Sequence, residues 1–163
     1  MLTHPFMQVD AFTSRPLGGN PCAIVFDTDD MTADTMQAIA REMNLSETAF
    51  VRRSEVADFG VRYFTPAEEI PLAGHPTIAT TFALVDTGRL ALTGSRTRLS
   101  LELRVGPIAV EIFSRNGAIE QIVMTQKKPA FMATYKPVEV LPVFSLSADD
   151  ALPGAPIQTS RSI

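Results

Sequence analysis

Apolar and polar residues alternate along several segments of the chain, as they do in strands that bury one face. Near the N-terminus, apolar residues occupy every second position of residues 7–11. Residues 22–26 form a short apolar run, and residues 45–51 and 59–65 return to a period of two. These patterns predict the first strands of a sheet.

A helical period follows the second of these strands. Thr32 is a suitable N-cap residue, and Asn44 can end a helix in a left-handed conformation. Met31 precedes the cap and can pack against an apolar residue of the first turns, as in a hydrophobic staple. Between the two caps, apolar residues recur with helical spacing at Met36, Ile39, Ala40 and Met43.

The stretch EEIPLAGHPTIATT, residues 68–81, leads from a loop into a second predicted helix over residues 77–86. Pro76 suits the first helical position, because the N–H group that proline lacks would have no partner there. Gly88 favours the end of this helix.

Residues 99–124 alternate again and contain two turn signals, Gly106-Pro107 and Asn116-Gly117, so we expect an antiparallel meander there. Prolines crowd the remaining residues, where one helical piece is predicted near residues 138–146. We therefore expect a first domain over residues 1–125, followed by a linker and the start of a second domain over residues 126–163.

Composition narrows the class of protein. The chain has 45% hydrophobic and 20% charged residues, which is typical of a globular protein with one sizeable core. A net charge of −4 without a basic cluster makes nucleic acid an unlikely partner. No segment has the length of apolar sequence that a membrane span needs, so we expect a cytoplasmic protein. One cysteine and two histidines cannot form a usual zinc site, which favours a protein without metal or cofactor.

His75 stands between a glycine and a proline at the predicted start of the second helix. The free N–H groups and the helix dipole at such a place can bind a carboxylate or phosphate. Gly74 would let a ligand approach the backbone, and the His75 ring can donate a hydrogen bond. The alternative is that His75 only caps a structural turn.

Glu47 interrupts an apolar row on a predicted strand, where it shares a face with Leu45, Ala49 and Val51. Partial desolvation of its carboxylate would suit a general acid or base. The alternative is that Glu47 lies at the edge of the sheet, reaches solvent, or pairs with an arginine such as Arg52 or Arg62.

Three blocks together resemble one known family. FTSRPLGGNPCAIVF (residues 12–26), NLSETAFV (44–51) and VRYFTPAEEIPLAGHPTIATTFAL (61–84) are similar to the phenazine-biosynthesis PhzF-like family, whose fold is that of diaminopimelate epimerase. The resemblance implies an α+β fold with a mostly antiparallel sheet wrapped around a central helix, here residues 76–86. It also implies a cofactor-independent isomerase that moves a proton between carbons of a small carboxylic acid.

The resemblance assigns roles to particular residues. Glu47 matches the family's acid/base glutamate, and His75 matches the histidine that holds and polarises the substrate. Gly74 and Thr77 belong to the same anion-binding turn. Asn20 and Ser46 match positions that line the same cleft.

The resemblance covers only the N-terminal half of the family's pattern, since members are nearly twice as long. The residues of the other half-site are not in this sequence, so we expect a truncated protein. A half that normally packs against a second half should expose an apolar surface, which predicts a homodimer. Two hypotheses follow: an isomerase with Glu47 as its general acid/base, or a catalytically silent half-domain that dimerises and at most binds a small acid. A soluble domain whose motifs are only structural is a third.

Overall fold

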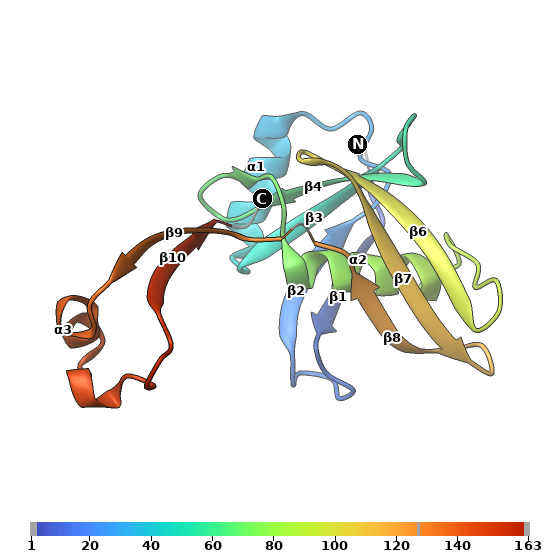
Figure 1. Cartoon of the computed structure of the whole chain (residues 1–163). Helices are drawn as coiled ribbons and strands as arrows, with labels where there is room; N and C mark the ends of the chain where they lie inside the picture. Colours follow the sequence, from blue (N-terminus) through green and yellow to red (C-terminus); the bar gives the residue numbers. More distant parts are fainter. Residues whose placement is uncertain (1–2, 127, 162–163) are drawn as a thin grey trace. The chain divides into compact units, whose positions relative to one another are not determined.

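The computed structural model describes residues 3–126 and 128–161 (Figure 1). The chain divides into two compact units, residues 1–125 and residues 126–163. Each unit is described by itself below.

The first unit contains one eight-stranded sheet. Its path of neighbouring strands runs β1-β2-β3-β4-β6-β7-β8, and β5 pairs with β4 off this path. The pairs β2–β3 and β4–β6 are parallel, and the other pairs are antiparallel. The strands are β1 (Phe6–Ala11), β2 (Asn20–Val25), β3 (Glu47–Arg52), β4 (Phe59–Phe64), β5 (Glu69–Ile70), β6 (Arg96–Leu103), β7 (Gly106–Arg115) and β8 (Ala118–Met124).

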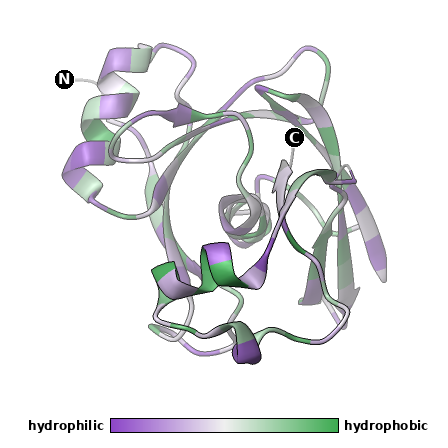
Figure 2. Ribbon diagram, turned by 60° about the vertical axis from the view of Figure 1, so that its left-hand side comes forward, coloured by the Kyte–Doolittle hydropathy of each residue, from purple (hydrophilic) through white to green (hydrophobic). Residues whose placement is uncertain are grey.

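The sheet curls around helix α2 (Gly74–Asp86), which Figure 2 shows nearly end-on at the centre of the view. The helix is apolar or small on almost every side, as a helix enclosed by a sheet must be. Its buried residues and inward-facing strand residues form the main hydrophobic core, which includes Ile24, Val51 and Leu101. The predicted α+β fold with a central helix is confirmed.

Helix α1 (Ala33–Met43) covers the other face of the sheet. Both of its predicted ends are confirmed: the Thr32 side chain accepts a hydrogen bond from the Thr35 backbone N–H, and Asn44 is left-handed with φ of 51°. Met36 and Ala40 form a second core cluster with residues of the sheet that include Phe50. Strand β3 therefore lies between two cores, which explains why it is buried on both faces.

Two predicted boundaries were wrong by a few residues. Helix α2 begins at Gly74 rather than Pro76, because proline is tolerated anywhere in the first turn, where N–H groups have no helical partner. The β6–β7 turn lies at residues 104–105 rather than at Gly106-Pro107. Gly106 has φ of 99° and pairs with Leu103, so its conformational freedom serves the first position of β7.

The β7–β8 hairpin is confirmed at Asn116-Gly117. Both residues have positive φ, 52° and 79°, as a two-residue type I′ turn requires. The tight turn fixes the antiparallel register of the two strands.

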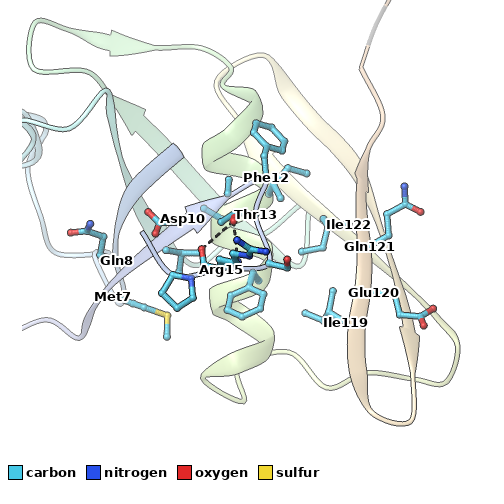
Figure 3. A pocket seen from close by; sticks show the side chains of 17 residues that line it. Met7, Gln8, Asp10, Phe12, Thr13, Arg15, Ile119, Glu120, Gln121 and Ile122 are labelled. Atoms are coloured by element: carbon cyan, nitrogen blue, oxygen red, sulfur yellow. Dashed lines mark hydrogen bonds between the residues drawn. The ribbon is translucent and has the colours of Figure 1, made fainter. Parts of the chain in front are cut away.

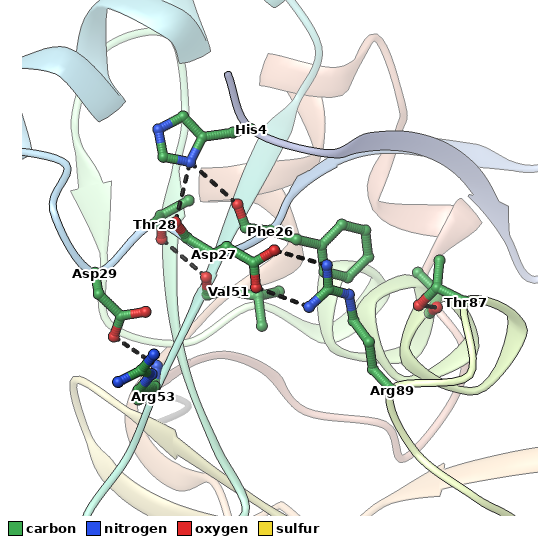
Figure 4. A network of polar contacts seen from close by, with 10 residues as sticks. His4, Phe26, Asp27, Thr28, Asp29, Val51, Arg53, Thr87 and Arg89 are labelled. Carbon is green, nitrogen blue, oxygen red and sulfur yellow. Dashed lines mark hydrogen bonds and ion pairs between the residues drawn. The ribbon is translucent and has the colours of Figure 1, made fainter. Parts of the chain in front are cut away.

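A polar network, shown in Figure 4, fastens the N-terminal segment to the end of β2. The His4 Nδ1 atom lies 3.3 Å from the Phe26 carbonyl oxygen and 3.0 Å from that of Asp27. Arg89, just after α2, donates two hydrogen bonds to the Asp27 carboxylate at 2.7 and 2.8 Å. These bonds lower the pKa of Asp27. The network thus ties the end of α2 to the strands around it.

The second unit has a two-stranded antiparallel sheet of β9 (Ala130–Tyr135) and β10 (Ile157–Arg161). The predicted helical piece near residues 138–146 is two short helices, α3 (Pro137–Val140) and η1 (Leu141–Phe144), with Pro142 at the start of the second. A third short helix, η2 (Ala148–Asp150), follows. None of residues 128–160 is buried.

Candidate active site at the start of the central helix

Glu47 is the first residue of β3 and points toward the central helix. Ala49 and Val51, which share its face of the strand, belong to the core cluster around α2. The Glu47 side chain is 20% exposed. The strand therefore holds a carboxylate at the rim of the core, mostly withdrawn from water.

The N-terminus of α2 has no side-chain cap. Its N-cap residue is Ala73, and the first turn contains no acidic residue. The N–H groups of Gly74 and His75 precede the first intrahelical bond, and Pro76 has none. This end of the helix therefore offers donors and a partial positive charge to an anion.

Glu47 and His75 meet at this place. The Glu47 Oε2 and His75 Nε2 atoms are 3.3 Å apart, and the His75 side chain is only 9% exposed. Both atoms are buried, yet neither has a hydrogen-bond partner within the described part of the chain, because their alignment falls outside hydrogen-bond geometry. The two groups thus face one another with unused hydrogen-bonding capacity.

The arginine alternative for Glu47 is wrong. Arg62 instead donates two hydrogen bonds of 2.8 Å to Glu69, and Arg104 lies 3.8 Å from the same carboxylate. The hydrogen bonds from Arg62 lower the pKa of Glu69. Glu69 is therefore a paired and partly buried residue.

Cys22 is the register partner of Glu47 across the parallel β2–β3 pair. Its side chain is fully buried in the main hydrophobic core. Burial raises the pKa of the Cys22 thiol to about 12, and the Glu47 charge contributes to the increase. The thiol is therefore not available as a nucleophile.

The other predicted site residues lie at the same end of the sheet or helix, with different exposure. Asn20 begins β2 and is exposed, two residues before Cys22, and Ser46 is exposed directly before Glu47. Thr77 is fully buried, and its hydroxyl donates to the Ala73 carbonyl oxygen at 2.6 Å. The Thr77 side chain thus supports the first turn of α2 from inside the protein.

A groove of the first unit lies elsewhere. It has a volume of about 780 Å³ and lies between β1, β8 and one side of α2, as Figure 3 shows. Phe82 of α2 lines it together with Ile119 and Ile122 of β8. Neither Glu47 nor His75 is among its lining residues.

No helix among the described residues is both long and apolar enough to cross a membrane.

Comparison with known proteins shows the family. The sequence model of the family described as phenazine biosynthesis-like protein matches residues 9–162, and the chain belongs to this family. It is 43% identical over 148 residues to trans-2,3-dihydro-3-hydroxyanthranilate isomerase of Pseudomonas chlororaphis, covering 88% of this chain and 50% of the relative. The chain therefore spans about half the length of this curated relative.

Two solved structures are also similar to this chain. The PhzF-family phenazine biosynthesis protein of Bacillus anthracis matches with a TM-score of 0.82 and 36% identity, covering 98% of this chain and 53% of the other. A hydroxyproline epimerase of Agrobacterium vitis matches with a TM-score of 0.61 and 14% identity, covering 82% of this chain and 46% of the other. The second match shows a shared fold alone.

Proposed function

We propose that the chain carries half of the active site of an isomerase of this family, with Glu47 as the general acid/base. The observation that supports this most is the 3.3 Å approach of Glu47 to His75 at the uncapped start of α2. This approach supports the proposal because it brings a carboxyl group and the uncapped end of a helix to one place.

The proposed reaction moves a proton within a small cyclic carboxylic acid. The substrate carboxylate would accept hydrogen bonds from the N–H groups of Gly74 and His75, with Asn20 and Ser46 at the rim. The Glu47 carboxylate would remove a proton from one carbon, while the electron pair of that C–H bond enters the substrate's double-bond system. The Glu47 carboxyl group would then return the proton to another carbon. No electrons are gained or lost overall, so the reaction requires no redox cofactor.

The name of the curated relative suggests a first substrate to test, trans-2,3-dihydro-3-hydroxyanthranilate. Incubation with the full chain in deuterated buffer should transfer deuterium to a substrate carbon, detected by mass spectrometry. Glu47→Gln keeps the size of the side chain and removes its basicity, so it should slow transfer at least about 100-fold. Glu42→Gln, on the exposed side of α1, is the matched control. Equal transfer in Glu47→Gln and the control would refute the role of Glu47.

A second candidate function is that of a silent half-domain that forms a homodimer and at most binds a small acid. Two observations favour it: the chain covers half the length of its relative, and the second unit exposes many large apolar side chains. The exposed apolar residues of the second unit are Phe131, Met132, Tyr135, Val138, Val143, Phe144, Leu146 and Leu152. In this proposal residues 126–163 are the linker and the beginning of a second domain, and the protein works in the cytoplasm.

Light scattering at micromolar concentration distinguishes a homodimer from a monomer. A dimer is expected, because a surface of this kind is rarely left exposed in a monomer. Phe144→Ser together with Val143→Ser should weaken the dimer without disturbing the core of the first unit. A monodisperse monomer would refute dimerisation.

A further inference from the structure

Two buried hydroxyl groups connect strand β4 to the start of α2. The Tyr63 hydroxyl of β4 lies 2.9 Å from the Thr77 Oγ1 atom, which in turn donates to the Ala73 carbonyl oxygen at 2.6 Å. Tyr63 is 1% exposed and Thr77 is fully buried. The connection is thus shielded from competition by water.

The direction of these hydrogen bonds follows from counting protons. Thr77 has one hydroxyl proton and gives it to the Ala73 carbonyl oxygen, so its oxygen must accept from Tyr63. Burial raises the pKa of the Tyr63 hydroxyl, which therefore remains a protonated donor. The result is a relay of two hydrogen bonds directed from β4 toward the N-cap residue of α2.

Both ends of the relay lead to the candidate site. Ala73 directly precedes Gly74 and His75, whose N–H groups are free to bind an anion. Tyr63 pairs across the sheet with Ala49, two residues after Glu47 on the same face of β3. The relay therefore spans from the strand pair that carries the carboxylate to the helix turn that carries the imidazole.

Apart from packing of the buried residues Ala73 and Pro76, few side-chain contacts fix the start of this turn. Ala73 provides no side-chain cap to the helix, and Glu47 and His75 do not have hydrogen-bond geometry despite their separation of 3.3 Å. A shift of the turn by a fraction of an ångström would thus break no other side-chain cap at its start. Packing encloses the turn, and the relay adds the directed side-chain hydrogen bond to its N-cap residue.

We propose that Tyr63 is a positioning residue, which acts through Thr77 to hold the first turn of α2 at a fixed distance from Glu47. The consequence for catalysis rests on the proposed function. The positional effect itself does not, and it can be measured without any substrate.

The competing explanation is that the two hydroxyls only satisfy one another in the core. In that case their removal would lower stability and leave the site unchanged. Thr81 provides a matched control, because it is also buried in α2 and donates to a helix carbonyl, that of Thr77, at 2.8 Å. The Thr81 bond stays within the helix and does not reach β4.

The experiment compares Tyr63→Phe, Thr77→Val and Thr81→Val in the full chain by NMR at constant pH. We expect Tyr63→Phe and Thr77→Val to shift the His75 ring resonances, whereas Thr81→Val lowers the melting temperature and leaves them in place. Thr77→Ser keeps the hydroxyl and should restore the wild-type resonances. His4, the other histidine of the chain, is an internal reference that should not move.

Benzoate is the probe for anion binding at the same turn. Tyr63→Phe and Thr77→Val should weaken benzoate binding roughly 3- to 10-fold, the effect of one displaced hydrogen bond. Resonances unchanged in both variants, with only a loss of melting temperature as in Thr81→Val, would overturn the proposal. If the wild-type chain does not bind benzoate, the proposed anion site fails, while the resonance shifts still decide the role of Tyr63.

Discussion

The two units of the chain differ in what encloses their apolar residues. In the first unit a sheet surrounds α2, and side chains such as Leu84 and Leu101 are fully buried. In the second unit none of residues 128–160 is buried, and residues such as Leu152 are 75% exposed. Hydrophobic burial is the main source of folding free energy, so the first unit has a core of its own, whereas the described residues of the second unit form none.

Hydrogen exchange should show the largest difference between the units. Backbone N–H groups of β2, β3 and α2 should exchange more slowly than those of β9 and β10 by about three or more orders of magnitude, because only the former open with the whole core. Mass spectrometry of peptic fragments measures both in one sample. Equal protection of the two regions would show that the second unit is already enclosed, for example by a second copy.

Truncation of a leucine to alanine should lower the free energy of unfolding strongly in the first unit and hardly at all in the second. Leu84→Ala removes a fully buried side chain of α2 and should cost about 2–5 kcal/mol of unfolding free energy. Leu152→Ala is the matched control and should change the unfolding of the first unit by no more than about 0.5 kcal/mol. Urea denaturation gives both values. A large cost for Leu152→Ala would mean that the units unfold as one.

Substituting one glycine in each unit tests the same difference between the units, with a smaller expected change in stability. A Cβ atom at Gly19 would lie 2.2 Å from the Ala11 carbonyl oxygen, so Gly19→Ala must displace the β1–β2 connection, at about 1–3 kcal/mol. Gly154 in the second unit has φ of 77° and no heavy atom within 4 Å of its Cβ position. Gly154→Ala should strain only its own turn, leaving the melting temperature of the first unit unchanged.

The smallest effect concerns the Arg62–Glu69 ion pair. Because the folded pKa of Glu69 is lowered, its stabilisation is present above the ordinary glutamate pKa and is lost as the pH falls through the lowered value. Arg62→Gln should remove about 1 kcal/mol of stability at neutral pH and flatten the loss of stability that occurs as the pH falls below the ordinary glutamate pKa. An unchanged pH profile in Arg62→Gln would contradict this assignment.

Some elements of the fold could be predicted from short stretches of the sequence. The caps Thr32 and Asn44 define α1, and Asn116-Gly117 defines the β7–β8 hairpin, because each feature depends on a few neighbouring residues. The parallel β2–β3 pairing could not be predicted in this way. It joins residues far apart in the chain, and its register is set by packing against both helices.

The residues of the candidate site could be predicted from the sequence only in part. Spacing identified Glu47 and His75 as chemically unusual, but the resemblance to a family was needed to prefer a shared site over solvent exposure or an arginine partner. The role of Tyr63 had no signal in the sequence, since a tyrosine in an alternating strand is ordinary. Only the fold brings its hydroxyl to Thr77.

The central claim is that Glu47 and His75 share one site at the start of α2, and the ring nitrogens of His75 report on it directly. Their ¹⁵N chemical shifts should be compared at constant pH in the wild-type chain, Glu47→Gln and the control Glu42→Gln. A shift of His75 in Glu47→Gln alone, with His4 unchanged, is the result expected from a separation of 3.3 Å. Identical His75 shifts in all three proteins would contradict the claim.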